Sequence, residues 1–271
     1  MDAVDDLGPV IAGAAGSRAR EIVAALRGLD EEALLAPSQL PDWSRLTIAC
    51  HLRYGAEALD RMTRAALAGV PTAYYPEGRD RQRPGTLLPR GAKQPDDVVA
   101  SLARRSEQLD TTWRALNHDD WQVEVIEPEE RRDLGPMRLT RLALLRLTEV
   151  EVHGSDLGLG VDDWSEFFVD VALPFRVEWL NTRRSNHRPV EASVRGSWLL
   201  VAVDGPSFVV SVDGDRTEAR QAGSRPTADA VIEATSRDLL ALLLGRPPRT
   251  APCYSDDTTL AEAFTRVFPG P

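Results

Sequence analysis

The sequence has little cysteine, no long apolar run and no basic cluster, and each shortage excludes a class of protein. Its 271 residues include two cysteines, Cys50 and Cys253, which lie far apart and form no CxxC pair. This spacing argues against a disulfide framework and against a cysteine-rich zinc module. The 42 acidic and 32 basic residues give a net charge of −10, and no stretch of five or six basic residues occurs. We therefore expect neither a nucleic-acid nor a membrane partner.

The first residues, MDAVDDLGPVIAGAAG, carry acids where an export signal needs basic residues, and their apolar stretch is short. This pattern predicts a cytoplasmic protein with reduced cysteines. Hydrophobic residues make up 42% of the chain and charged residues 27%, which is typical of a soluble globular protein. A chain of this length favours two domains.

Apolar residues recur at the helical period in the first 160 residues. One of the helices that they indicate begins at Ser44, a favourable cap, and ends at Gly69. The pattern predicts a four-helix bundle over residues 1–160. Its helices are expected over 17–29, 44–69, 95–116 and 137–158.

Between the second and third helices lies a stretch rich in proline and arginine, VPTAYYPEGRDRQRPGTLLPRGAKQP. A connection this long is usually functional, so residues 71–95 are expected to form a substrate loop. Arginine suits carboxylates by its forked geometry. The candidate substrate-binding residues are Tyr75, Arg79, Arg81 and Arg83.

The pattern changes to period two after residue 185, with Asp-Gly turns that are typical of antiparallel strands. Residues 226–245 predict a helix that ends at Gly245, and residues 161–185 predict a helical connection. The expected fold class is thus α+β with two domains. The bundle precedes a small α+β domain with an antiparallel sheet over residues 186–271.

The last helix of the bundle carries an apolar stripe that continues into polar residues. Steps of three and four from Leu142 lead to Leu145, Glu149, His153 and Asp156, so Glu149 is expected to point inward. Glu151 lies about 200° around from Glu149 and is expected on the surface.

An inward carboxylate needs a proton, a partner or a cation. His153 lies one turn from Glu149, and His51 stands on or beside the apolar face of the helix over 44–69. Two histidines and one glutamate with an open position are typical of catalytic zinc. Hydrogen-bonded core residues also give this spacing, and the pattern alone leaves both interpretations open.

Three segments, LPDWSRLTIACHL, YYPEGRDR and LTEVEVHGSDLGLG, resemble the mycothiol-dependent maleylpyruvate isomerase family of DinB-like metal-binding four-helix bundles. The resemblance implies that Trp43 leads into a helix that bears the first metal ligand, His51. It implies that Glu149 and His153 supply the other two. The implied cofactors are a divalent metal, expected to be zinc, and mycothiol as thiol cosubstrate.

The second half, with SRDLLALLLGR, is similar to the family's sterol-carrier-protein-like C-terminal domain. In that domain an arginine after the final helix supports activity. Arg246 takes that position here, with Arg237 as a nearby alternative. Asp156 is expected either to hydrogen-bond a ligand histidine or to cap the turn around Gly154.

The resemblance implies an enzyme that activates mycothiol as a metal-bound thiolate for attack on a small-molecule electrophile. The reaction is either S-transfer or a cis–trans isomerisation of the maleylpyruvate type, and the unusual composition of the 71–95 loop favours the transferase. The alternatives are a metal-dependent hydrolase that uses a bound water and a non-catalytic binding or regulatory protein.

Overall fold

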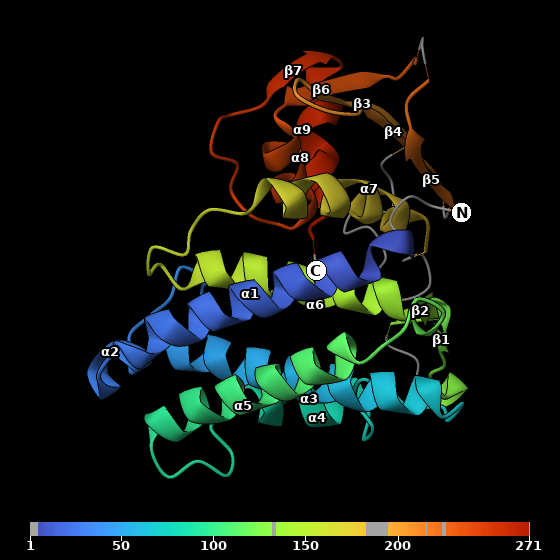
Figure 1. Cartoon of the computed structure of the whole chain (residues 1–271). Helices are drawn as coiled ribbons and strands as arrows, with labels where there is room; N and C mark the ends of the chain where they lie inside the picture. The colour runs from blue at the N-terminus through green and yellow to red at the C-terminus, as the bar shows by residue number, and fades with distance from the viewer. Residues whose placement is uncertain (1–4, 132–133, 183–194, 215, 224–225, 271) are drawn as a thin grey trace. The chain divides into compact units, whose positions relative to one another are not determined.

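The computed structural model describes residues 5–131, 134–182, 195–214, 216–223 and 226–270 (Figure 1). The chain divides into two compact units, Met1–Trp164 and Ser165–Pro271. Within the described residues, no helix has both the length and the apolarity needed to cross a membrane.

The first unit is a bundle of four long helices, as predicted (Figure 1). Helix α1 packs against α5 and α6, and α3 packs against the same two helices. The seam between α3 and α6 is therefore opposite the seam between α1 and α5. The four helices are α1 (Gly8–Arg27), α3 (Arg45–Leu67), α5 (Pro95–Arg114) and α6 (Leu139–Asp156).

Shorter elements precede or join the four helices. They are the 3-10 turns η1 (Asp5–Leu7), η2 (Asp120–Gln122) and η3 (Glu129–Arg131), the helices α2 (Glu31–Leu35) and α4 (Arg79–Thr86), and an antiparallel pair of strands, β1 (Glu124–Val125) and β2 (Met137–Arg138).

Local chemistry explains where the helices begin. The Ser44 side chain accepts a hydrogen bond of 3.1 Å from the Thr47 amide and caps α3 at the predicted residue. Helix α1 begins at Gly8, earlier than predicted, because Ile11, Ala12 and Ala15 are buried and extend its apolar face.

The segment expected to be a loop over residues 71–95 contains a helix, α4, of eight residues. Gly78 precedes it with a φ of 88°, a conformation that glycine adopts without strain. The Thr86 hydroxyl donates to the Arg83 carbonyl at 2.8 Å near the end of the helix. Arg79, Arg81 and Arg83 therefore stand on a short helix.

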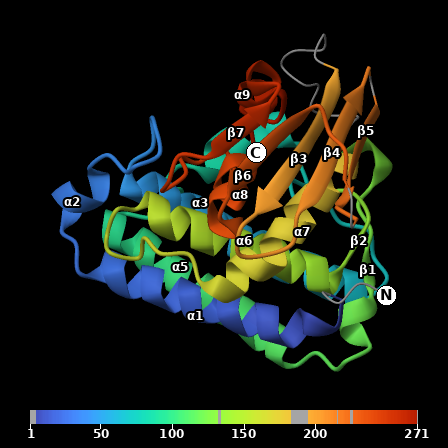
Figure 2. The ribbon, with the colours of Figure 1, turned by 90° about the horizontal axis from the view of Figure 1, so that it is seen from above.

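In the residues that the structure describes, the second unit contains a five-stranded sheet and three helices, which confirms the α+β class (Figure 2). The strand order is β5-β4-β3-β6-β7, and all pairs are antiparallel except β3 with β6, which is parallel. The elements are α7 (Glu166–Thr182), β3 (Gly196–Ala202), β4 (Phe208–Asp213), β5 (Arg216–Gln221), β6 (Ala230–Ala234), α8 (Ser236–Leu243), β7 (Cys253–Asp256) and α9 (Thr258–Val267).

Two features of this unit differ from the sequence-based expectation. The predicted helix over 226–245 is a strand, β6, followed by α8, because Ala230, Ile232 and Ala234 alternate toward the core. Helix α7 lies in the segment expected to be a connection and packs against α8 and β5 of its own unit. The expected limit between residues 185 and 186 lies outside the described residues.

Candidate metal centre

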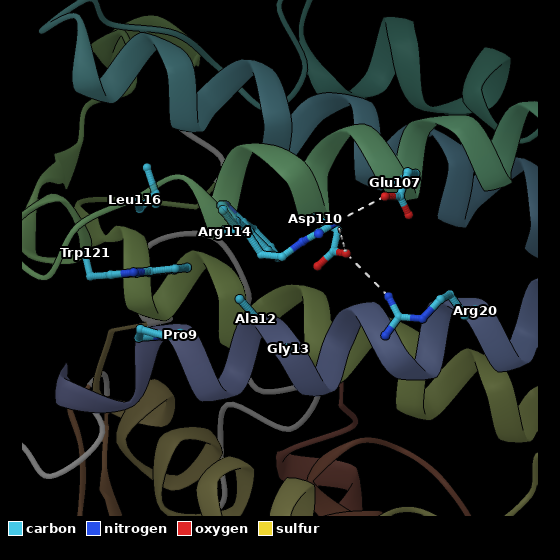
Figure 3. A pocket seen from close by; sticks show the side chains of 10 residues that line it. Pro9, Ala12, Gly13, Arg20, Glu107, Asp110, Arg114, Leu116 and Trp121 are labelled. Atoms are coloured by element: carbon cyan, nitrogen blue, oxygen red, sulfur yellow. Dashed lines mark hydrogen bonds and ion pairs between the residues drawn. The ribbon is translucent and has the colours of Figure 1, made fainter.

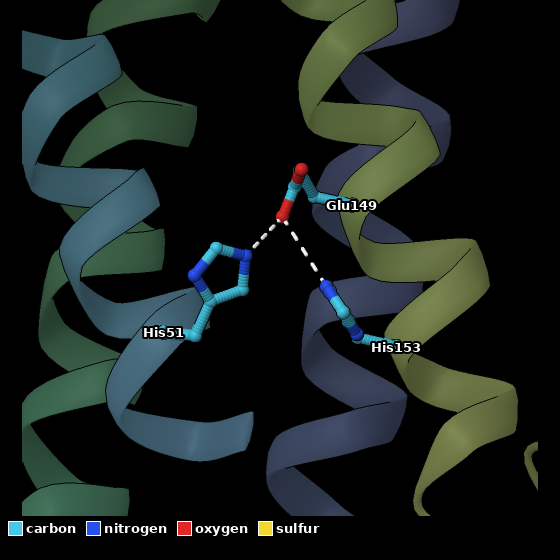
Figure 4. Close-up of side chains that lie close together, drawn as sticks. All are labelled: His51, Glu149 and His153. Carbon is cyan, nitrogen blue, oxygen red and sulfur yellow. Dashed lines mark hydrogen bonds and ion pairs between the residues drawn. The ribbon is translucent and has the colours of Figure 1, made fainter. Parts of the chain in front are cut away.

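Three side chains that can bind a metal converge on the seam between α3 and α6. His51 points from α3 toward Glu149 and His153, which lie one turn apart on α6 (Figure 4). His51 Nε2 lies 2.5 Å from Glu149 Oε2, and His153 Nε2 lies 3.6 Å from the same oxygen. One ligand atom from each residue falls within a cluster whose atoms all lie within 4.8 Å of one another.

The carboxylate of Asp156 forms a hydrogen bond with the ring of His153. Asp156 lies one turn further along α6, and its Oδ2 is 2.9 Å from His153 Nδ1. A carboxylate accepts, so Nδ1 is the donor, and in the neutral imidazole the lone pair of His153 is then on Nε2, toward Glu149. Carboxylate–histidine pairs of this kind orient the ring at metal sites.

Trp43, just before α3, packs against both imidazoles. Its ring lies 5.8 Å from the ring of His153 in a stacked arrangement and 5.4 Å from His51 in an edge-to-face arrangement. The two histidine rings are themselves 4.8 Å apart. The predicted turn residue therefore also restricts the rotamers of both histidines.

The charges around the cluster favour the protonation states that ligands need. Burial raises the pKa of Glu149, but the neighbouring His51, His153 and Arg146 outweigh it and bring that pKa down to about 2. Burial lowers the pKa of His51 and outweighs the opposing effect of Glu149. At neutral pH the pair is thus a carboxylate beside a neutral imidazole, the forms that bind metals.

The donor set fits a divalent cation. Two imidazole nitrogens and one carboxylate oxygen are ligands of catalytic zinc sites, in which a fourth position stays open.

The three side chains differ in exposure to solvent. The exposed fraction is 37% for the side chain of Glu149 and only 11% and 12% for those of His51 and His153. Glu149 is thus the most accessible member of the cluster.

The structure separates the loop residues that the sequence grouped together. The Arg83 guanidinium lies 5.9 Å from the centre of the Trp43 ring, which brings it beside the cluster. Arg81 pairs with Glu77 at 3.4 Å and has 80% of its side chain exposed. Arg79 is also exposed. Arg83 thus contacts Trp43, which itself packs against both histidines.

Tyr75 is buried rather than displayed to solvent. Its ring stacks on Tyr54 at 5.4 Å and meets Tyr74 edge-to-face at 4.9 Å. The aromatic pair that the sequence shows at 74 and 75 is thus a packed cluster against α3. Its role in substrate binding stays a prediction.

The two arginine candidates of the second unit lie at opposite ends of α8. Arg246 follows the helix and donates from Nη1 to the Leu244 carbonyl at 3.2 Å. Arg237 stands in the first turn, where burial lowers the pKa of its guanidinium and Asp238 lies 3.8 Å away. The functional role of either residue stays a prediction.

The expectation that Glu151 is a surface residue is wrong. Glu151 is 3% exposed, and its Oε2 lies 3.1 Å from Arg18 Nε. The physical reason is that α1 packs along α6 and covers the side opposite the α3 seam. A single apolar stripe could not reveal that α6 is buried on more than one face.

Two polar residues near the cluster were not found from the sequence. Arg146 is 2% exposed on α6, and Tyr74 lies beside Tyr75 with its hydroxyl next to Gly55. The signal for Arg146 was present, since a basic residue interrupts the leucines of α6. Whether Arg146 is buried or exposed depends on which helices pack against α6, and the helical period does not specify this.

A separate cavity of about 530 Å³ lies on the opposite seam, between α1 and α5 (Figure 3). Its charged groups are paired with one another, because Asp110 accepts from Arg20 at 3.4 Å and from Arg114 at 2.9 Å. Trp113 and Trp121 line the rest together with small residues of α1. The cavity contains none of the three ligand-type residues.

The fold and the cluster define a class: a helical bundle with a two-histidine, one-glutamate centre, followed by an α+β unit. Residues 16–158 match the model of the mycothiol maleylpyruvate isomerase N-terminal domain. The match covers more than half of the chain, and the protein belongs to this family.

Solved structures show the same fold over nearly the whole chain. A crystal structure of the mycothiol-dependent maleylpyruvate isomerase is similar with a TM-score of 0.66 and 19% identity, covering 94% of this chain and 96% of that one. A histidine-to-alanine mutant of that isomerase matches with the same TM-score and coverage at 18% identity. At this level of identity the similarity establishes the fold.

Proposed function

We propose that this protein is an enzyme that uses a divalent metal, expected to be zinc, and mycothiol to attack a small-molecule electrophile. The reaction is S-transfer or a cis–trans isomerisation of the maleylpyruvate type. The observation that carries the proposal is the convergence of His51, Glu149 and His153 from two helices within 4.8 Å. Family membership supports mycothiol as the thiol.

In this proposal His51, Glu149 and His153 hold the metal. Asp156 accepts from His153 Nδ1 and keeps Nε2 free to bind, while Trp43 restrains both rings. A divalent cation in such a site lowers the pKa of a bound thiol, so that the sulfur is a nucleophile at neutral pH.

The thiol sulfur then forms a bond to carbon of the electrophile. In the isomerase reaction the sulfur adds to the cis double bond, and the electron pair of that bond moves onto the conjugated carbonyl. After rotation the pair returns and the carbon–sulfur bond breaks. In the transferase reaction the bond to a leaving group breaks instead, and the sulfur stays on the product.

We favour the transferase. The unusual composition of the 71–95 segment supports this choice, and its α4 brings the Arg83 guanidinium to 5.9 Å from the centre of the Trp43 ring. Arg83 and Arg246 are proposed to bind anionic groups of the reactants, since a guanidinium forms paired hydrogen bonds with carboxylates.

Metal content tests the centre. Purified protein should contain roughly one divalent ion per chain, and His51→Ala and Glu149→Ala should each lose it. His118→Ala is the matched control, because His118 is exposed and lies outside the cluster. Full metal retention in both cluster variants would refute the proposed centre.

Thiol dependence tests the reaction. Maleylpyruvate and electrophiles with a leaving group should be converted only when mycothiol is present, and loss of the metal should abolish conversion. Hydrolysis of a substrate without thiol would instead assign the centre to a metal-dependent hydrolase. A metal-loaded protein with no affinity for mycothiol by calorimetry would contradict the proposed thiol chemistry.

A further inference from the structure

Four cationic side chains line one cavity of the first unit, away from the metal centre. The cavity has a volume of about 400 Å³ and lies between α3, α5 and the connection from α4 to α5. Arg53, its residue on α3, follows His51 by two positions and so points about 200° away from it. The other three cations are Arg90, Lys93 and Arg104. In a chain with a net charge of −10, such a basic cavity is a local exception that favours an anionic ligand.

The lining of this cavity carries three more positive than negative charges, because Asp97 is its one carboxylate against four cations. Asp97 Oδ2 accepts from the backbone amides of Lys93 at 2.9 Å and Gln94 at 3.1 Å. These two hydrogen bonds, followed by the charges of Lys93 and Arg104, lower the pKa of Asp97. Among the described residues, the side chains of Arg90, Lys93 and Arg104 form no ion pair within 4.0 Å. Most of the positive charge is therefore available to a ligand.

Two of the guanidinium groups are held in place by their surroundings. Arg53 donates from Nη2 to the Leu88 carbonyl at 3.2 Å and from Nη1 to the Arg90 carbonyl at 3.4 Å. The Arg90 guanidinium lies against Gly85 of α4, where a Cβ would come within 2.5 Å of Cζ. A guanidinium has five N–H donors, so both groups keep donors for a ligand. The Ser101 hydroxyl of α5 also lines the cavity, and in the described part of the chain it forms no hydrogen bond.

A second cavity, of about 300 Å³, adjoins the first and shares two of its arginines and its serine. The charges of this second cavity are balanced. Its two carboxylates are each paired with an arginine, Glu57 with Arg105 at 3.5 Å and Glu77 with Arg81 at 3.4 Å. Together the two cavities match a ligand that has an anionic group at one end and an uncharged polar part at the other.

We propose that the basic cavity binds the phosphate group of a small phosphate monoester, whose uncharged part extends into the second cavity. At neutral pH such a phosphate carries about −1.5 to −2 charges and three acceptor oxygens, which match the excess positive charge and the several donors. Arginine binds phosphate through paired hydrogen bonds and lysine binds it as a point charge. The bound phosphate joins α3 and α5 to the connection between α4 and α5. This site requires neither the metal nor mycothiol, so it is independent of the proposed function.

Calorimetric titration of the metal-loaded protein with inorganic phosphate and with glycerol phosphate tests the site. Arg90→Gln and Arg104→Gln each remove a charged donor, so both ligands should bind roughly 10- to 100-fold more weakly to either variant. Arg27→Gln is the matched control, because Arg27 is exposed at the end of α1, and it should bind as the wild type does. Equal affinities in all four proteins, or no binding to the wild type at about millimolar concentration, would refute the site.

A second variant displaces one guanidinium and keeps every charge. Gly85→Ala places a methyl group against Arg90 Cζ, whereas Gly13→Ala makes the same change on α1, where a Cβ would meet nothing within 4 Å. We expect phosphate to bind about tenfold more weakly only to Gly85→Ala, since Arg90 loses its position. Wild-type affinity in Gly85→Ala would contradict a phosphate held by Arg90.

Two further measurements separate this site from other places where phosphate could bind. His51→Ala removes a proposed metal ligand on the opposite side of α3, so it should bind phosphate as tightly as the wild type does. Phosphate affinity that is lost in His51→Ala but kept in Arg90→Gln would place the anion on the metal and overturn the proposal. Co-sedimentation with vesicles that contain phosphatidic acid should capture no protein. Capture by these vesicles, without binding of glycerol phosphate, would assign the cavity to a lipid headgroup instead.

Discussion

Two glutamates share one arginine in the bundle, and replacing each by glutamine tests the burial of Glu151. Arg18 Nε lies 3.1 Å from Glu151, whose side chain is 4% exposed, and Arg18 Nη1 lies 2.9 Å from Glu21, whose side chain is 58% exposed. The two changes are chemically identical. They differ only in the depth at which the carboxylate is lost.

The structure sets the size of the two effects. Removing one partner of a buried ion pair costs about 3–5 kcal/mol of unfolding free energy. Arg18 would still donate from Nη2 to the carbonyls of Val161 at 3.0 Å and Asp163 at 2.5 Å, so we expect about 3 kcal/mol for Glu151→Gln. An exposed pair within one helix contributes little, so Glu21→Gln should cost less than about 0.5 kcal/mol.

Urea unfolding followed by circular dichroism at the helical wavelength measures the difference. Because the chain has two units, the transition of the bundle must be resolved from that of the α+β unit before a free energy is assigned. In thermal unfolding the same cost corresponds to a shift of roughly 6–12 °C. Equal stabilities of Glu151→Gln and Glu21→Gln would refute the burial of Glu151.

Three further predictions concern the metal centre and the thiols. Asp156→Asn should weaken metal binding about 10- to 100-fold in competition with a chelating indicator, because His153 loses the carboxylate that orients it; unchanged affinity would contradict this role. Chelation should lower the thermal midpoint of the wild type but not that of Glu149→Ala, and equal shifts in both proteins would exclude the centre as their cause. Burial raises the pKa of Cys50 from 9.0 to about 11, so at pH 8 a thiol reagent should modify exposed Cys253 but not Cys50 until urea is added. The buried neutral thiol stabilises the fold below pH 9, and this contribution is lost as the pH rises from 9 to 11.

The helices of the bundle and two members of the cluster could be predicted from local patterns. The Ser44 cap and the 3.6-residue period define α3, and the same period places Glu149 and His153 on one face of α6. These features depend only on residues within one or two helical turns along the chain, so the sequence is sufficient to predict them. The α+β class of the second half likewise followed from the change to period two.

Other features were beyond local patterns. The loop over residues 71–95 contains α4, and the helix predicted over 226–245 is divided between β6 and α8. Short elements gain most of their stability from packing rather than from propensity, so their sequences specify them weakly. Strands β3 and β6 are parallel neighbours in the sheet, although β4 and β5 lie between them in the sequence. No local sequence pattern specifies such a pairing.

By itself, the sequence determined which residue types could bind a metal and their helical phase on α3 and α6. Only the tertiary structure decided that His51 faces Glu149 across a seam, that Glu151 pairs with Arg18, and that Tyr74 and Arg146 meet beside Gly55. The physical reason is that the helical period specifies only the direction in which each side chain points around the axis of its own helix. Which helix covers each direction depends on the packing of the whole bundle, and packing decides which charges are buried and which meet.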